Sequence, residues 1–233
     1  MIFAYVNEKK VHIDDVEKGT MGIDILTRLK VKACKGHYRQ YWKYVDGKPN
    51  LPRGYENETE WHNAWKRCIQ DEYVEVICGE HNEHRAAIKT EKCVIEPILG
   101  AADYDVIKER IDFYNKLTKK RVIFIVNAYK SVAKNRIDFK RKNADKKYLI
   151  VNWKYKREWA CDVSGYNNTN VFLDISKDKD LLLRIWKHDG LLYGDMTTKT
   201  KFYNIYLKKY CKREGSLLEF LNGFKNLDYN DYM

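Results

Sequence analysis

The sequence has no apolar run of about 18 residues, the minimum that a membrane-spanning helix requires. It also lacks a C-x-x-C pair, an internal repeat and any low-complexity tract. The first residues, Met1–Val6, contain no basic segment and no small-residue cleavage site, so they predict a strand and not a signal peptide. The six cysteines are scattered along the chain, which favours reduced thiols in a cytoplasmic protein over a disulfide framework.

The composition is sufficient for a folded core but is unbalanced in charge. Hydrophobic residues make up 44% of the 233 residues and aromatic residues 14%, so wholesale disorder is not expected. The 44 Lys and Arg residues exceed the 33 Asp and Glu residues and give a net charge of +11. This excess favours a polyanionic partner, with nucleic acid first. The alternative is a solvated surface in a lysine-rich protein.

Four segments can be distinguished along the chain. Residues 1–54 are β-rich and basic, and residues 55–128 have the pattern of an α/β core. Residues 129–147 are strongly basic with few large apolar residues, which is typical of a mobile connector or of an arm that contacts phosphates. Residues 148–233 return to β character and end in a helix and a polar, frayed tail.

In the first segment, Tyr38–Tyr44 alternates cations with aromatic residues. Such a strand could stack bases while its cations hold phosphates. It could equally be a half-buried strand whose aromatic side chains face a core. The period of two by itself predicts the second arrangement, which we favour.

Hydrophobic periodicity defines the elements of the core. Trp61 and Trp65 fall on one apolar helix face, so both are expected to be buried and the neighbouring Lys66 exposed. The expected order is a helix near 58–70, strands near 73–78, 84–89 and 93–98, a helix near 103–118 and a strand near 121–126. Farther along, strands are expected around Trp153, Trp159, 171–175 and 181–186, and a helix at 199–209. This order predicts the α/β (α+β) class, with a mixed sheet flanked by helices.

Four groups of residues form a recognisable pattern across these elements: Glu60-Trp61-His62 with Trp65-Lys66; His84-Arg85-Ala86; Val94-Ile95-Glu96; and Ile107, Glu109, Arg110, Phe113 and Tyr114 in the pattern I-x-E-R-x-x-F-Y. In these residues and in the order of its elements, the chain resembles the competence protein CoiA-like family over roughly residues 55–210. The resemblance implies the restriction-endonuclease-like fold of the PD-(D/E)xK superfamily. The family's zinc ribbon has no counterpart, because Cys34 has no cysteine nearby.

Two side chains depart from the family's active-site pattern, H-R-A-D-I followed by I-E-x-Q-x-S. Ala87 stands at the position of the aspartate and Ile98 at that of the glutamine. In the family, the carboxylates hold a divalent metal that activates water, and Glu96 alone cannot hold Mg²⁺ strongly. Ala87 alone would suit an engineered substitution, whereas Ile98, Leu99 and Gly100 favour natural loss of the site. Pro97, which lacks an N–H, predicts an edge or a bulge.

The resemblance therefore predicts a pseudo-nuclease that keeps a remnant catalytic site of Glu96, Glu60, His62 and His84. No cofactor or metal is expected, and Mg²⁺ or Mn²⁺ would bind at Glu96 only if the site were active. The expected partner is nucleic acid, DNA before RNA, or a nucleic-acid-processing protein, with a phage or mobile-element role against host defence as one setting. The candidate nucleic-acid-binding residues are Arg85, Lys89, Lys66, Arg39, Lys43, Arg141 and Lys142. An active endonuclease studied as a mutant, and an interaction module without a nucleic-acid role, are the alternatives.

Strand alternation makes a geometric prediction for this site. Ala87 and Ile98 should point the same way as Glu96, into the cleft between the first helix and the sheet, and Ile98 should pack against apolar neighbours. Glu96 should then face solvent or pair with a cation, with Arg85 and Lys89 as the candidates. His81, Glu83 and His84, with Cys78 nearby, could form a metal site, but hydrogen-bonded or solvated histidines are favoured.

Overall fold

The computed structural model describes residues 1–37, 40–47, 49, 58–99, 102–118, 120–141, 148–154, 158–166, 168–176, 179–213, 216–225 and 227. The N-terminal segment forms a five-stranded antiparallel sheet, called here the small sheet, with the strand order β2-β1-β3-β4-β5. Its strands are β1 (Phe3–Val6), β2 (Lys9–His12), β3 (Met21–Ile23), β4 (Lys30–Lys35) and β5 (Gln40–Tyr44). The strand expected at the N-terminus is confirmed, and Tyr38 and Arg39 lie outside the described residues.

The rest of the chain forms one nine-stranded sheet, the large sheet, with the order β10-β11-β14-β13-β12-β9-β8-β7-β6. Strand β9 pairs in parallel with both β8 and β12, and the other pairs are antiparallel. The strands are β6 (Val74–Cys78), β7 (His84–Lys89), β8 (Cys93–Ile98), β9 (Arg121–Asn127), β10 (Ile137–Arg141), β11 (Leu149–Trp153), β12 (Thr169–Asp174), β13 (Leu182–His188) and β14 (Leu191–Thr197).

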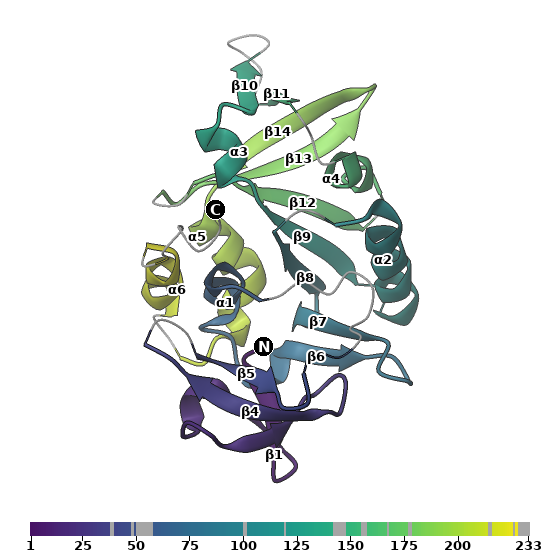
Figure 1. Cartoon of the computed structure of the whole chain (residues 1–233). Helices are drawn as coiled ribbons and strands as arrows, with labels where there is room; N and C mark the ends of the chain where they lie inside the picture. The colour runs from purple at the N-terminus through teal and green to yellow at the C-terminus, as the bar shows by residue number, and fades with distance from the viewer. Residues whose placement is uncertain are drawn as a thin grey trace.

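Helices cover both faces of the large sheet (Figure 1). Helices α2 (Tyr104–Thr118) and α4 (Glu158–Val163) lie on one face, and α1 (Glu60–Lys66), α5 (Lys199–Phe202) and α6 (Ser216–Lys225) lie on the other. The short helix α3 (Tyr129–Ala133) follows β9, and irregular helical turns continue α5 to Tyr210. The mixed α and β class and the order α1-β6-β7-β8-α2-β9 are therefore confirmed.

Each face of the large sheet has its own hydrophobic core. The α1-side core contains Trp61 and Trp65 and extends into the small sheet through Phe3 and Trp42. The α2-side core is built around Tyr114 and the apolar residues of α2, α4 and the central strands. Because β8, β9 and β12 lie between the two cores, apolar side chains dominate β8, β9 and the middle of β12 (residues 171–173), as expected for strands buried on both faces.

Two elements differ from the sequence-based expectations. Trp159 lies in helix α4 and not in a strand, because Trp159, Ala160 and Val163 turn toward the sheet with helical spacing. The basic segment 129–147 is not simply a connector: α3 occupies its start, and β10 follows and pairs along its whole length with β11. Ile137 anchors β10 in the α2-side core, and residues 142–147 lie outside the described residues.

Pro97 lies in a central strand, yet the expectation of a local edge is met at this position. Within the described residues, β7 pairs with β8 only through Ile88 opposite Ile95 and Lys89 opposite Val94. Beyond Ile95 the two strands separate, while β8 continues alongside β9. A proline is tolerated at this point because no ladder hydrogen bond to β7 is lost there.

We predict that Trp65→Ala will lower the free energy of unfolding by about 3–5 kcal/mol, because it leaves a cavity where α1 meets α5 and α6. The Trp65 ring contacts the rings of Phe202, Phe220 and Phe224, with centroids 4.8–5.5 Å apart, and is fully buried. Urea unfolding measures the change. The half-buried Trp186 of β13 is the matched control, and an equal loss in Trp186→Ala would contradict the prediction.

Candidate functional site

Glu96 lies on the face of the large sheet that α2 covers, and not in the predicted cleft beside α1. Along β8, Val94 and Ile98 belong to the α2-side core, whereas Cys93 and Ile95 belong to the α1-side core. Alternation therefore places Glu96 between Val94 and Ile98, beneath α2. The expectation that Glu96 and Ile98 share a face is confirmed, but the helix that they face is the second one.

Glu96 is only 4% exposed, and residues of α2 satisfy its carboxylate. The Tyr114 hydroxyl donates a hydrogen bond of 2.9 Å to Oε1, and the Arg110 guanidinium lies 3.8 Å from Oε2. The backbone N–H of Ala87 also donates a hydrogen bond to this carboxylate. Burial raises the pKa of the Glu96 carboxyl, and Arg110 and Tyr114 oppose this rise only in part. The predicted ion pair with Arg85 or Lys89 is thus replaced by one with Arg110.

Ile98 and Ala87, which depart from the family's pattern, lie close to Glu96 and offer no further carboxylate. Ile98 is buried and packs in the α2-side core, as predicted. Ala87 lies where β7 leaves β8, and it contributes its backbone N–H and no carboxylate. His84 packs its ring against Phe113, with centroids 4.4 Å apart, and burial lowers the pKa of its imidazole. The remnant site is therefore filled by side chains of the protein itself.

The residues present at Glu96 do not fit a divalent metal. Mg²⁺ and Mn²⁺ prefer several oxygen ligands with octahedral access, whereas both oxygens of Glu96 already face donors from α2. Among the residues that the structure describes, no three His, Cys, Asp or Glu side chains gather so that they could hold a metal ion. We therefore derive no metal-dependent step from this geometry.

The other two predicted catalytic residues lie on α1, on the opposite face of the large sheet from the Glu96 carboxylate. His62 is only 6% exposed, so it does not lie on a solvated face of the helix. Its Nδ1 accepts a hydrogen bond from the Thr59 N–H at 3.1 Å, which caps the start of α1. Glu60 lines a different hollow, of about 510 Å³, together with His12, Asp71 and Lys212. The structure therefore does not bring Glu60, His62 and Glu96 into one site.

A second cluster of charged side chains, the Lys66 network, lies buried between α1, β6, β7 and the small sheet. Lys66 is 2% exposed, so the prediction that it faces solvent is wrong. Its Nζ lies 2.5 Å from Glu58 and 3.0 Å from Glu75. Arg85 lies 3.8 Å from Glu75 and 3.9 Å from Asp24 of the small sheet. These ion pairs join the two sheets, because buried charges are tolerated only when they are paired.

Glu75 reaches this network through an unusual backbone conformation. Its φ is +47°, in the left-handed region that non-glycine residues seldom adopt. On either side of it, Val74 packs in the α1-side core and Val76 against the α2-side core, so the alternation of β6 is broken at Glu75. The break turns the carboxylate toward Lys66. Backbone strain of this kind persists only where surrounding contacts impose it.

The network shifts the ionisation of its members in opposite directions. Burial acts to raise the pKa of Glu58, but Lys66, the N-terminal amino group and Arg85 together outweigh it and hold that pKa well below its usual value. Burial acts to lower the pKa of Lys66, but Glu58 and Glu75 outweigh it and raise the pKa. Stability from Glu58 is therefore present above its ordinary pKa and is lost as the pH falls through the depressed value. That from Lys66 is lost only as the pH rises through its raised value.

The structure describes the side chains of four of the seven predicted nucleic-acid-binding cations, and two of these four are enclosed in ion pairs. Lys66 is buried in its network, and the Arg85 side chain is only 8% exposed. Lys89 is half-buried and Lys43 is exposed on β5. Arg39, Lys142 and the side chain of Arg141 lie outside the described residues. Of the seven cations, only Lys43 is fully exposed among those that the structure describes.

Sequence reasoning did not identify several residues of the buried clusters. Glu75 and Asp24 were not singled out, and neither were Asp174 and Lys199, whose charged atoms lie 2.7 Å apart beside the Trp61 indole. In the sequence, the only signal for the Lys66 network is that Glu58, His62 and Lys66 are spaced at i, i+4 and i+8, as on one helix face. A single acidic residue inside an apolar strand, as in Val74–Cys78, is the pattern that would identify such pairs.

Comparison with known proteins gives no match to a family model, to a curated protein or to a solved structure. The resemblance described above therefore stays a prediction. No helix in the described part of the chain is long and apolar enough to cross a membrane.

We predict that Lys66→Met will lower the free energy of unfolding by about 3–5 kcal/mol, because it leaves two buried carboxylates without their cation. Chemical denaturation at neutral pH measures the loss. The exposed Lys108 of α2 is the control, and Lys108→Met should change stability by no more than about 0.5 kcal/mol. The double variant K66M/E75M should cost less than the sum of the two single changes. Strict additivity would contradict the network.

We predict that Glu96→Gln will stabilise the protein at neutral pH. The pKa of Glu96 is raised above its ordinary value of 4.5, so the folded state binds more protons than the unfolded state just above that pH. Wild-type stability therefore falls as the pH rises through this window, whereas a neutral amide does not titrate. The advantage of Glu96→Gln should vanish near pH 4.5 and below. A less stable variant at neutral pH would show that the Arg110 ion pair outweighs burial.

Proposed function

We propose that this protein is a catalytically disabled nuclease-fold protein of the CoiA-like type that binds nucleic acid or a nucleic-acid-processing partner. One observation carries the proposal: Glu96 is sealed beneath α2, with Tyr114 and Arg110 on its two oxygens. A phosphodiester and a metal ion would both need access to this carboxylate. In this proposal the protein acts in the cytoplasm, with its six cysteines reduced, and a phage or mobile-element origin is one setting for it.

The order of elements supports the nuclease part of the proposal. A helix, three antiparallel strands, a second helix and a strand parallel to the third form one continuous unit from α1 to β9. The two positions that carry the family's carboxylates, Ala87 and Glu96, fall where β7 and β8 separate, since both lie one residue beyond the last pair of these strands. In this unit β7 and β8 separate after Ile95, and Ala87 and Ile98 lie at this point in place of the polar side chains of the family.

Charge supports the binding part of the proposal. Lys66 and Arg85 pair with buried carboxylates and therefore do not account for the net charge of +11. The excess positive charge comes from Lys and Arg residues outside this network. A polyanion is the partner that such an excess favours. DNA is proposed before RNA on the resemblance alone.

An active endonuclease is the competing proposal, and a cleavage assay separates the two. We predict no conversion of supercoiled plasmid by the wild-type protein with Mg²⁺ or Mn²⁺, and no change on Glu96→Ala. Agarose electrophoresis over a protein titration measures it. Metal-dependent cleavage that Glu96→Ala abolishes would overturn the proposal. The double variant A87D/I98Q, which restores the family's residues, should stay inactive as long as Arg110 and Tyr114 occupy Glu96.

A further inference from the structure

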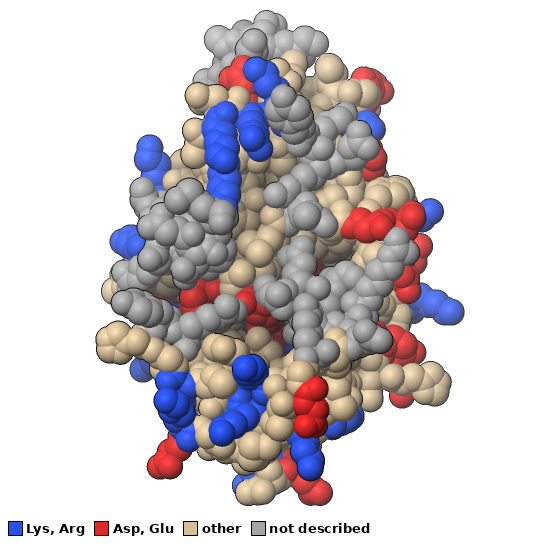
Figure 2. All heavy atoms as spheres, viewed as in Figure 1, with Lys and Arg blue, Asp and Glu red and all other residues tan. Residues whose placement is uncertain are grey.

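The outer face of the small sheet carries exposed lysines that take no part in the buried ion pairs. In β4 the odd-numbered Val31 and Ala33 are buried, whereas Lys30 and Lys32 are exposed, so the strand has one buried and one solvated face. Figure 2 shows Lys and Arg side chains over the lower part of the molecule, where Figure 1 places the small sheet. The sequence K-V-K-A thus separates charge from core within one strand.

Strand register places these cations in two neighbouring rows on that face. One row runs Tyr5–Ile23–Lys30 across β1, β3 and β4. The next row runs Met21–Lys32–Lys43 across β3, β4 and β5. Residues directly opposite each other on paired strands share a face, so both rows point outward together. Met21 is 49% exposed, which leaves an apolar surface beside the two lysines of its row.

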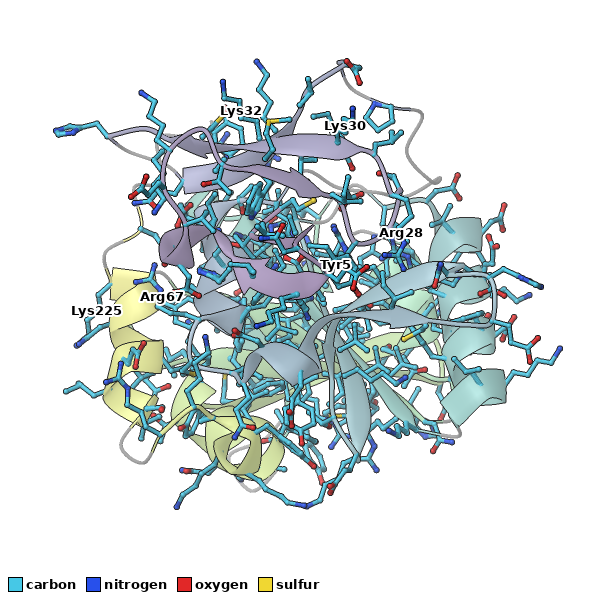
Figure 3. The ribbon with its side chains drawn as sticks, turned by 90° about the horizontal axis from the view of Figure 1, so that it is seen from below. Tyr5, Arg28, Lys30, Lys32, Arg67 and Lys225 are labelled. Atoms are coloured by element: carbon cyan, nitrogen blue, oxygen red, sulfur yellow. The ribbon has the colours of Figure 1, made fainter. Side chains whose placement is uncertain are left out.

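An aromatic ring and a guanidinium lie at the end of the first row. The guanidinium carbon of the exposed Arg28 lies 5.0 Å from the centroid of the half-buried Tyr5 ring, in a cation–π arrangement (Figure 3). Together with Asn7, Glu8 and Ile23, they line a hollow of about 420 Å³. Stacking on aromatic rings and on guanidinium planes is how proteins hold unpaired bases.

The turn that presents Arg28 is fixed by the interior. The Asp24 carboxylate accepts hydrogen bonds from the Thr27 N–H at 2.9 Å and from the Thr27 hydroxyl at 2.7 Å. The Arg28 N–H donates to the Asp24 carbonyl at 3.1 Å, with φ of +61° at Arg28. Asp24 also lies beside Arg85 of the Lys66 network. The position of Arg28 is therefore set before any ligand arrives, which lowers the entropic cost of binding.

Few acidic groups oppose this face. Among the described residues, Arg28, Lys30, Lys32 and Lys43 form no ion pair in the structure. Glu8 is the carboxylate at the rim of the hollow. A carboxylate there disfavours a phosphate and accepts hydrogen bonds from the amino groups of a base. A base could thus lie in the hollow beside Tyr5 and Arg28, while phosphates could lie along Lys30, Lys32 and Lys43.

We propose that the outer face of the small sheet binds single-stranded nucleic acid, with Lys30, Lys32 and Lys43 along the phosphates and a base held at Tyr5 and Arg28. The inference rests on the proposed function and specifies its ligand and surface. A duplex fits less well, because its bases are stacked within the helix and cannot reach the hollow beside Tyr5. Neither the resemblance nor the Glu96 region contributes a residue to this surface.

Fluorescence anisotropy with labelled oligo(dT) and oligo(U), and with a duplex of equal length, tests the proposal on the whole chain. The variant K30A/K32A/K43A should lose at least about tenfold in affinity for the single strands near ~0.1 M salt. Its log–log salt slope should fall by about 2, since each lost phosphate contact on a single strand removes about 0.7. The control K108A/K116A/K201A removes the same charge from exposed lysines elsewhere and should bind nearly as the wild type does.

Tyr5→Leu tests the base-holding part, since leucine keeps an apolar group but offers no ring for stacking. It should weaken single-strand binding about fivefold or more and leave the salt slope unchanged. Circular dichroism and thermal unfolding verify that each variant is folded. Equal losses in the two triple-lysine variants, an unchanged affinity in Tyr5→Leu, or tighter binding of the duplex would each overturn this inference. Failure of the wild-type chain to bind any nucleic acid would instead refute the nucleic-acid part of the proposed function.

Discussion

The ammonium group of Lys66 is the constraint on which the rest of the structure depends. It lies between Glu58 and Glu75, and Arg85 continues the chain of charges to Asp24 in the small sheet. A buried charge is tolerated only in the geometry that pairs it, so this network admits one placement of the small sheet against α1 and the large sheet. The left-handed backbone at Glu75 is the strain that this placement imposes.

The same constraint separates the two faces of the large sheet chemically. On the α1 side, the buried charges form ion pairs that join α1, the large sheet and the small sheet. On the α2 side, the buried carboxylate of Glu96 lies under a helix that supplies Tyr114 and Arg110 as its partners. Ile98 and the backbone of Ala87 close the remaining space. What was expected to be a cleft is therefore a packed core with one satisfied acid in it, and the geometry favours structure over chemistry at this position.

Because Lys66 and Arg85 form ion pairs in the interior, a polyanionic partner must be bound by other cations. The small sheet supplies them by strand alternation, which turns Val31 inward and Lys30 and Lys32 outward. Asp24 serves both regions, since it lies beside Arg85 and also holds the turn that carries Arg28. The interior network thus holds in place the turn that carries Arg28, which belongs to the proposed binding face.

The sequence by itself determined the mixed class, the order of elements from α1 to β9, and the burial of Trp61 and Trp65, because period and hydrophobicity are local properties. It also predicted that Ile98 would lie among apolar neighbours. Only the tertiary structure decided which helix covers Glu96 and that Lys66 and His62 are buried. It also decided that the segment after β9 forms α3 and then β10, the last strand of the large sheet. Those outcomes depend on contacts between residues far apart in the chain, such as Lys66 with Glu75 and Arg85 with Asp24, and on a break in alternation that no local pattern encodes.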